Sequence, residues 1–330
     1  MNALIPLIAV IVLFLVGWLG TDQAGLYVLF GAAIPYIAIV VFFCGLVYRV
    51  VRWAASPVPF RIPTTCGQQK SLDWIRPNPV DNPYTLFGVL VRMALEILFF
   101  RSLLRNTKTE LKSGPRVVYS SNIWLWLGAM AFHWSFLVIL IRHMRFFTEP
   151  VPFFVTFLHQ ADGFFQVGVP IFYATSFILL AALSYLLLRR LFSPQLRYIS
   201  LVNDYFPLFL LIGIGLSGFW LRYITKTDIV AVKELALGLV SFTPTFPESV
   251  SPLFYGHLFL VCTLFIYFPF SKLMHMAGVF LSPTRNLANN NRMVRHINPW
   301  NYPVKVHTYE EYEDDFREKM KKAGIVVEKE

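Results

Sequence analysis

The stretch AMAFHWSFLVILIRHMR, residues 129–145, decides the fold class of this chain. It is apolar enough to lie in the hydrocarbon region of a bilayer, and the apolar segment around it is long enough to span one. Yet it contains two histidines, His133 and His143. An ionisable side chain inside a membrane span costs free energy and usually has a function. The stretch therefore predicts a membrane protein with a functional site inside the membrane.

A second apolar stretch, residues 253–281, contains another pair of histidines, His257 and His275. One histidine near the end of a span is often an ordinary interfacial side chain. Two spans that each carry two histidines are harder to explain in that way. These four residues are the principal candidates for the functional site.

The composition supports a membrane protein. Of 330 residues, 56% are hydrophobic and 15% charged, whereas a soluble domain carries about 25% charged residues. The net charge of +10 comes from basic residues beside apolar spans, a pattern that the positive-inside bias explains. The aromatic residues are mostly Phe inside the spans, which argues against a nucleic-acid partner.

The three cysteines, Cys44, Cys66 and Cys262, form no C-x-x-C motif. The chain therefore offers no disulfide framework, zinc knuckle, iron–sulfur motif or attachment site for c-type haem. Any iron–sulfur or c-type haem chemistry must belong to a partner.

The hydropathy pattern predicts an all-α integral membrane protein with six transmembrane helices, at residues 1–20, 26–50, 123–144, 166–191, 201–223 and 253–281. The chain then divides into two N-terminal spans (1–50), an insertion (51–120), four spans that complete a bundle of four or five helices around two cofactors (121–281), and a polar tail (282–330). No basic n-region or cleavage site is evident before residue 20, so we interpret that segment as a retained helix.

The insertion combines a Pro-rich connection, residues 56–82, with a predicted helix over residues 83–112. This helix mixes apolar residues with Arg92, Glu96 and Arg101. The mixture favours a helix lying on the membrane surface, and packing against a soluble partner is the alternative.

Lysines and arginines near the span ends predict the orientation. The loop 21–25 has none, the loop 189–200 has three arginines, and the segment 49–120 has many. Both termini, the insertion and the tail are therefore predicted to lie in the cytoplasm, in the cytoplasmic membrane of a bacterium or archaeon. The connection 222–252, with Arg222, Lys226 and Lys233, fits this pattern least well.

The predicted topology pairs the four histidines by depth. The third and sixth spans run antiparallel, so His143 should face His257 near the outer surface and His133 should face His275 near the inner surface. Neutral imidazole is a good iron ligand, and two bis-histidine sites are what two haems b require.

The helical geometry permits this pairing if the helices are tilted. Eighteen residues separate the histidines of the sixth span, which is about five turns and places both on one face. The rise is then about 27 Å, against about 15 Å for the ten residues of the third span, and helix tilt must absorb the difference.

Two other interpretations are weaker. Four histidines in two distant pairs, without a nearby carboxylate or cysteine, make no tetrahedral zinc site. A transporter or proton-conducting subunit with a histidine relay would carry carboxylates at mid-membrane depth, and the six predicted spans have almost none. The remaining histidines, His159, His296 and His307, lie in a loop and in the tail, where surface residues are common.

The spacings of ten and eighteen residues resemble those of the gamma subunit of respiratory nitrate reductase, a di-haem cytochrome b family. The resemblance covers about residues 26–281. The additional first helix, the insertion and the tail are closer to the membrane cytochromes of sulfite-reduction-associated Dsr complexes, the DsrM family.

This resemblance implies an electron-transfer subunit of a quinol oxidoreductase complex in sulfate or sulfite reduction. Electrons of menaquinol would pass through two haems b to a cytoplasmic iron–sulfur subunit of heterodisulfide-reductase type. A multihaem cytochrome c, a periplasmic ferredoxin-like protein and a second membrane subunit are the other implied partners.

The same resemblance places quinol oxidation beside the outer haem. Arg145, His159 and Asp162 lie in that region and are the candidate quinone-binding residues, with His159 or Asp162 able to accept a quinol proton. Arg142 is a candidate for binding a haem propionate, and a lipid phosphate is the alternative partner.

Overall fold

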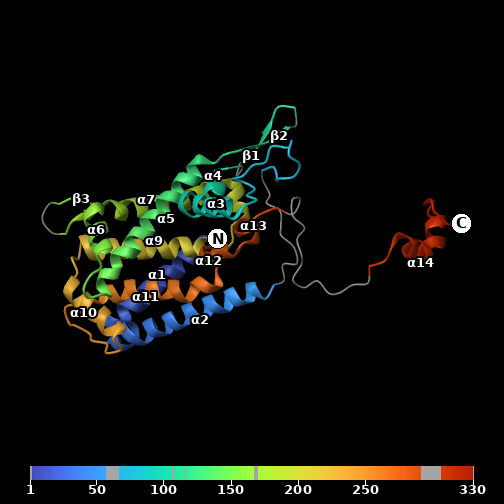
Figure 1. Cartoon of the computed structure of the whole chain (residues 1–330). Coiled ribbons are helices and arrows are strands. Elements are labelled where there is room, and N and C mark those ends of the chain that lie inside the picture. Colours follow the sequence, from blue (N-terminus) through green and yellow to red (C-terminus); the bar gives the residue numbers. More distant parts are fainter. Residues whose placement is uncertain are drawn as a thin grey trace.

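A computed structural model describes residues 2–56, 67–105, 108–114, 116–166, 170–290 and 306–329. Within these residues, six helices are long and apolar enough to cross a membrane, and they run side by side along one direction (Figure 1). They are α1 (Leu4–Asp22), α2 (Ile34–Ala54), α5 (Ile123–His143), α7 (Ala174–Phe192), α9 (Val202–Tyr223) and α11 (Pro252–Tyr267). The predicted six-span, all-α fold is confirmed.

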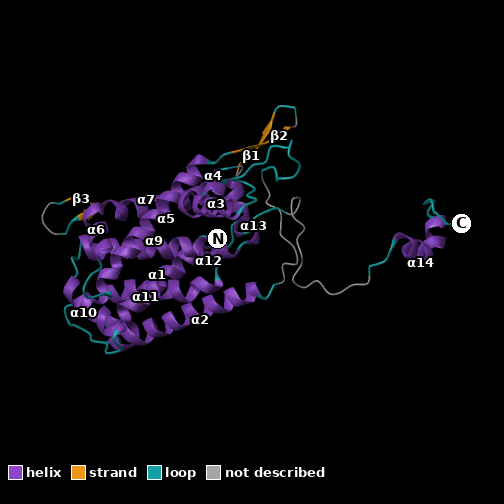
Figure 2. Ribbon diagram, in the orientation of Figure 1, coloured by secondary structure: helices purple, strands orange, loops and turns teal. Residues whose placement is uncertain are grey.

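Shorter elements connect the spans (Figure 2). The helices are α3 (Leu86–Phe99), α4 (Arg101–Leu104), α6 (Phe153–Asp162), α8 (Pro194–Ile199), α10 (Ile229–Val240), α12 (His275–Leu281), α13 (Pro283–Asn286) and α14 (Tyr309–Lys322). Two small antiparallel hairpins pair β1 (Lys108–Lys112) with β2 (Arg116–Ser120) and β3 (Gly163–Phe165) with β4 (Phe172–Tyr173).

Helix α11 lies at the centre of the bundle, packed against α1, α2 and α9, while α7 packs against α5 and α9. Glycines allow α1 and α11 to approach closely. A Cβ atom on Gly17 would lie 2.9 Å from Cβ of Phe259, and one on Gly256 would lie 2.9 Å from the ring of Phe14. Small residues at such crossings are typical of helices in membranes.

The two ends of the bundle are held by different contacts. At the end that carries the insertion, which we call the insertion end, Asn2 donates to the Ser200 carbonyl over 3.1 Å. At the other end, which we call the opposite end, Tyr36 donates to the Leu239 carbonyl over 3.0 Å. The connection 222–252, whose basic residues fit the predicted orientation least well, lies at this end. Its Lys233 forms an ion pair with Glu149.

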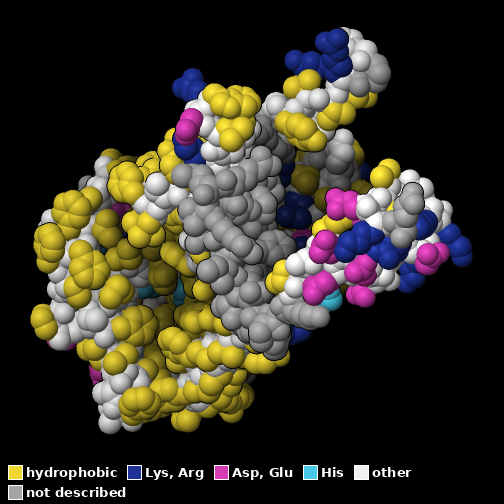
Figure 3. All heavy atoms as spheres, turned by 45° about the vertical axis from the view of Figure 1, so that its right-hand side comes forward, with side chains coloured by type: hydrophobic (Ala, Val, Ile, Leu, Met, Phe, Trp, Pro, Cys, Tyr) yellow, Lys and Arg dark blue, Asp and Glu magenta, His cyan; other side chains and the backbone are white. Residues whose placement is uncertain are grey.

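The side of the bundle is apolar, as Figure 3 shows for one face. Exposed Leu, Ile, Val and Phe side chains cover the spans, which is the pattern of helices whose surroundings are lipid. On the face in view, charged side chains gather on the tail segment and on the projecting part of the insertion.

The helix predicted over residues 83–112 is wrong in its second half. Helix α3 ends at Phe99 because Phe100 adopts the left-handed conformation, with φ of 47°. A short α4 follows, and the chain then forms the hairpin of β1 and β2. The alternation of KTELK and RVVYS around Gly114, which has φ of 82°, favours strands over a continued helix.

Helix α3 buries charged side chains and exposes apolar ones, the reverse of an amphipathic helix in a soluble protein. Its charged residues Arg92 and Glu96 are buried, at 6% and 8% exposure, whereas Leu86 and Phe87 are 74% and 75% exposed. Lipid or a protein partner could each cover this outward apolar face, so both predictions for the helix stay open.

The single span predicted over residues 253–281 is also wrong. Helix α11 ends at Tyr267, two short 3₁₀ turns follow, and α12 begins at His275. Pro269 cannot donate to a continued helix, and Ser271 is fully extended, with φ of −117° and ψ of 178°. The two histidines of this stretch therefore lie on separate helices, and the straight-helix rise of about 27 Å does not apply.

The polar tail contains a helix, α14, that starts with a capping box of Thr308 and Glu311. After α14 ends at Lys322, the chain folds back against this helix. The backbone N–H groups of Glu328 and Lys329 donate to the buried carboxylate of Glu313. His296 lies outside the described residues.

Candidate functional site

The first histidine pair lies toward the insertion end. His133, in the middle of α5, and His275, the first residue of α12, have ring centroids 6.0 Å apart and ring planes at 81°. Because a metal–imidazole bond is about 2 Å long, this separation leaves room for one metal ion between two imidazoles. The break after α11 is what turns the chain so that His275 meets His133.

The second pair lies toward the opposite end. His143 is the last residue of α5, and His257 is near the start of α11. The two imidazoles are near enough to interact electrostatically. The helices α5 and α11 do not pack closely against each other, because α5 packs mainly on α7 whereas α11 packs on α1, α2 and α9.

None of the four histidines is fully buried: His143 and His275 are exposed, and His133 and His257 are half-buried. Figure 3 shows histidine side chains visible from outside, in a hollow between apolar surfaces of the bundle. Apolar walls, separated helices and histidines in a hollow between them together fit a flat, largely apolar cofactor bound between helices.

In three of the four histidines, Nδ1 is bonded to a carbonyl oxygen of the same chain segment. The distances from Nδ1 are 2.8 Å to Ala129 for His133, 2.7 Å to Ile139 for His143, and 2.8 Å to Lys272 for His275. A carbonyl can only accept, so Nδ1 carries the hydrogen and Nε2 keeps its lone pair. This tautomer, fixed by a bond at the other nitrogen, is the usual state of a metal-ligating histidine.

His257 is held differently. Its Nδ1 lies 2.8 Å from Oγ of Ser217, a buried residue of α9. The Ser217 hydroxyl donates to the carbonyl of Gly213 over 2.7 Å, so its oxygen is free to accept from the imidazole. Nε2 of His257 is therefore also the unprotonated nitrogen.

Aromatic residues surround His133. The rings of Phe100 and Phe132 meet its imidazole edge-on, with centroids 4.8 and 4.7 Å away. Two tryptophans of α5 fasten the insertion nearby: Trp126 donates to the Phe99 carbonyl over 2.6 Å and Trp134 to the Leu98 carbonyl over 3.1 Å. These bonds satisfy carbonyls at the C-terminal end of α3, where no helical partner is available.

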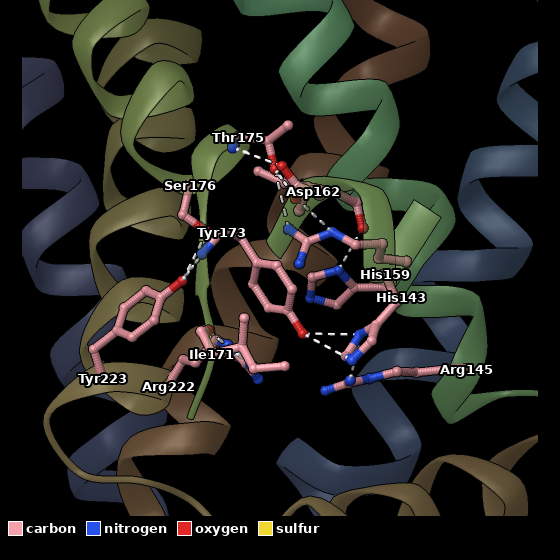
Figure 4. A network of polar contacts seen from close by, with 12 residues as sticks. His143, Arg145, His159, Asp162, Ile171, Tyr173, Thr175, Ser176, Arg222 and Tyr223 are labelled. Atoms are coloured by element: carbon pink, nitrogen blue, oxygen red, sulfur yellow. Dashed lines mark hydrogen bonds and ion pairs between the residues drawn. The ribbon is translucent and has the colours of Figure 1, made fainter. Parts of the chain in front are cut away.

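A polar network lies at the opposite end (Figure 4). Its anchor is Asp162, the last residue of α6, which is 8% exposed. Its Oδ1 accepts from the backbone N–H of Thr175 over 2.9 Å, and its Oδ2 accepts from the Thr175 hydroxyl over 2.6 Å. Nε of Arg142 lies 3.1 Å from Oδ2, an ion pair rather than an aligned hydrogen bond. Both carboxylate oxygens of Asp162 are therefore engaged.

Tyr173 lies at the centre of this network and is 1% exposed. The guanidinium carbons of Arg142 and Arg222 lie 3.7 and 4.4 Å from its ring centroid, in cation–π contact. Its hydroxyl is 2.8 Å from Nδ1 of His159. Figure 4 shows Tyr173 of β4 among side chains of other elements, with His159 from α6, Arg222 from α9 and His143 from α5.

His159 connects the network to the surface. Burial lowers the pKa of His159, and the positive charges of Arg145, Arg222 and Arg142 lower it further. Arg145, with Nη1 at 3.4 Å from Nδ1, can only donate, so Nδ1 of His159 acts as an acceptor. His159 also lines a pocket of about 360 Å³ whose other walls include Gln160 and Phe164.

No group of three or more His, Cys, Asp or Glu side chains in the described ranges is arranged to hold a metal ion. Carboxylates of the described spans lie only at span ends, at Asp22 and Asp204, and Asp204 is bonded to Lys272.

A family model built on the gamma subunit of nitrate reductase matches residues 84–296. The chain belongs to the nitrate reductase gamma-subunit family. The family predicted from the histidine spacings is thus confirmed, and the match contains all four histidines as well as α3.

Two curated relatives are similar over most of their length. Both are named Hdr-like menaquinol oxidoreductase cytochrome b-like subunit. The protein of Archaeoglobus fulgidus is 48% identical over 280 residues, which is 83% of each chain. The protein of Archaeoglobus profundus is 45% identical over 275 residues, which is 81% of each chain. These Hdr-like relatives agree with the predicted closeness to the DsrM group.

Several residues that organise the opposite end were not predicted from the sequence. Tyr173 and Thr175 follow Asp162 closely in sequence, but the pairing of β3 with β4 that brings them to it was not predicted, and Arg222 comes from the more distant α9. Ser217 lies in the GIGLSG motif, where its small size signals close helix packing and conceals its bond to His257.

Proposed function

We propose that this chain is the di-haem b subunit of a membrane menaquinol oxidoreductase. His143 and His257 would hold the outer haem, and His133 and His275 the inner haem. Each haem would supply a reversible one-electron carrier. The observation that carries the proposal is the common state of the four histidines: each has Nδ1 bonded and Nε2 free, on helices that stand apart.

The opposite end supports a site for quinol oxidation. A quinol releases two electrons and two protons, so the site needs a neutral base. His159 has a lowered pKa, borders a pocket, and has Arg145 beside it. We assign proton acceptance to His159 and the binding of a quinol oxygen to Arg145. Asp162 and Arg142 are engaged with each other, so in this proposal they position Tyr173 instead of touching quinol or a propionate.

The insertion end would deliver electrons to a partner in the cytoplasm. The positive-inside bias favours a cytoplasmic position for this end, because basic residues are frequent in the insertion, and in this proposal both termini would lie on the same side. The partner implied by the relatives' Hdr-like name is an iron–sulfur subunit of heterodisulfide-reductase type, with sulfate or sulfite reduction as its setting. A multihaem cytochrome c, a ferredoxin-like protein and a second membrane subunit complete the proposed complex.

The test is a reduced-minus-oxidised spectrum of the purified protein together with its haem-to-protein ratio. We expect b-type absorbance and two haems per chain. The double variant His133→Ala, His143→Ala should lose both, because each haem then lacks one axial ligand. Absence of b-type absorbance, or retention of a haem by the double variant, contradicts the proposal. The matched control is His307→Ala, on the tail.

A further inference from the structure

Among the four proposed ligands, His257 is the one whose imidazole is held by another helix. The three others bond to carbonyls three or four residues before them. His257 donates from Nδ1 to Oγ of Ser217, 2.8 Å away on α9. Its orientation therefore depends on how α9 and α11 pack together.

The contacts of Ser217 leave its Oγ atom able to accept this hydrogen bond. Its side chain is 7% exposed, and its own hydrogen is directed to carbonyls of α9, at 2.7 Å for Gly213 and 3.1 Å for Ile214. A hydroxyl that donates in this way is polarised and becomes a better acceptor. The next residue, Gly218, leaves space for the ring, since a Cβ there would lie 3.2 Å from Cε1 of His257.

We propose that Ser217 is a positioning residue that fixes the ring of His257 and raises its electron donation to the outer haem iron. An acceptor at Nδ1 makes the imidazole a more basic ligand, which stabilises the oxidised form of the iron. This inference rests on the proposed function, because it takes His257 to be a haem ligand.

The test is a potentiometric titration of the haem-loaded protein in its membrane complex, with low-temperature EPR of both haems. Ser217→Ala should move the midpoint potential of the outer haem to a more positive value and shift its EPR signal. The inner haem should keep both properties. Ser217→Thr retains a hydroxyl and should return the outer haem toward its original potential.

Ser135 supplies a matched control. It is a buried serine of α5 that also bonds back to the carbonyl four residues before it, at 2.6 Å to Ala131, and it has no bond to a histidine. Ser135→Ala should leave both haems unchanged. An outer-haem potential and EPR signal that stay as in the wild type in Ser217→Ala, or an equal shift in Ser135→Ala, overturn the inference.

If Ser217→Ala loses the outer haem, Ser217→Val keeps the test decisive, because Thr and Val have the same shape and differ only by the hydroxyl. Retention of the outer haem by Ser217→Thr together with its loss in Ser217→Val supports the inference. Loss of the outer haem in both variants overturns it.

His257→Ala separates the failure of this inference from the failure of the proposed function. If that variant keeps two haems, the proposed function fails; if it loses the outer haem while Ser217→Ala changes nothing, only this inference fails.

Discussion

The two ends of the bundle each present a pair of histidines in very different surroundings. At the insertion end, His133 and His275 lie among aromatic rings and backbone carbonyls. At the opposite end, His143 lies beside a network of three arginines, a buried carboxylate and a histidine that borders a pocket. Under the proposed function, His159 in the second environment would accept the protons of quinol, so electron transfer would be coupled to proton release at that end.

Removing single ligands should separate the two ends most strongly. We expect His143→Ala or His257→Ala to lose the outer haem, and His133→Ala or His275→Ala the inner haem, which lowers the haem content from two to one per chain. Spectra and the quantity of extracted haem measure this. Loss of the inner-haem signal in His143→Ala contradicts the pairing of the two ends.

Replacing the proposed base should reduce quinol oxidation without reducing haem content. We expect His159→Gln to slow the reaction about 100-fold, since a positioned general base contributes about 10²–10⁴-fold. Steady-state oxidation of a soluble menaquinol analogue measures this. Phe164→Leu, in the same pocket but without a titratable group, is the control. An unchanged rate in His159→Gln removes that residue from the mechanism.

The pH profile should report on the arginines of the same network. Only neutral His159 accepts a proton, so the rate is retained above its pKa and lost as pH falls through it. Because burial and then Arg145 lower this pKa, the wild-type rate should persist below the ordinary histidine range. Arg145→Gln removes one positive charge and should move the acid limb toward higher pH. A shift toward lower pH contradicts the proposed electrostatic coupling.

Disrupting the anchor of the network should cost stability. Asp162→Asn leaves the buried guanidinium of Arg142 without its counter-charge, and we expect a loss of about 2 kcal/mol in the free energy of unfolding. Unfolding in detergent, followed by outer-haem absorbance, measures this. Glu149→Gln, which breaks a more exposed ion pair with Lys233, should cost less. Equal losses in the two variants contradict the structural role of Asp162.

The smallest effect is expected at the insertion end. Trp134→Phe removes the donor to the Leu98 carbonyl and should cost about 1 kcal/mol. Faster amide hydrogen exchange over α3 and α4, with both haems retained, is the expected readout. Trp124→Phe is the control, since Trp124 is 71% exposed and lies on the same helix. Faster exchange in the control as well removes the special role of Trp134.

Local signals in the sequence predicted the spans, because apolar runs and polar caps such as Asn122 act within a few residues of the chain. The four histidines could be recognised as candidate site residues because they interrupt these apolar runs. The break at Pro269–Ser271 was missed because a proline is tolerated in many membrane helices. The network around Tyr173 could not be predicted, since it depends on the short β3–β4 pairing, which the sequence does not signal, and on Arg222 from the more distant α9.

The bend between α11 and α12 has a consequence for electron tunnelling, whose rate falls steeply with distance. A straight helix would separate His257 from His275 by about 27 Å along its axis, while the ten residues between His133 and His143 rise only about 15 Å. With the helix broken at Pro269–Ser271, that straight-helix separation does not apply, and His275 meets His133 after the break. Under the proposed function, this proline-containing turn would set the distance between the two haems, and with it the rate at which an electron passes from one to the other.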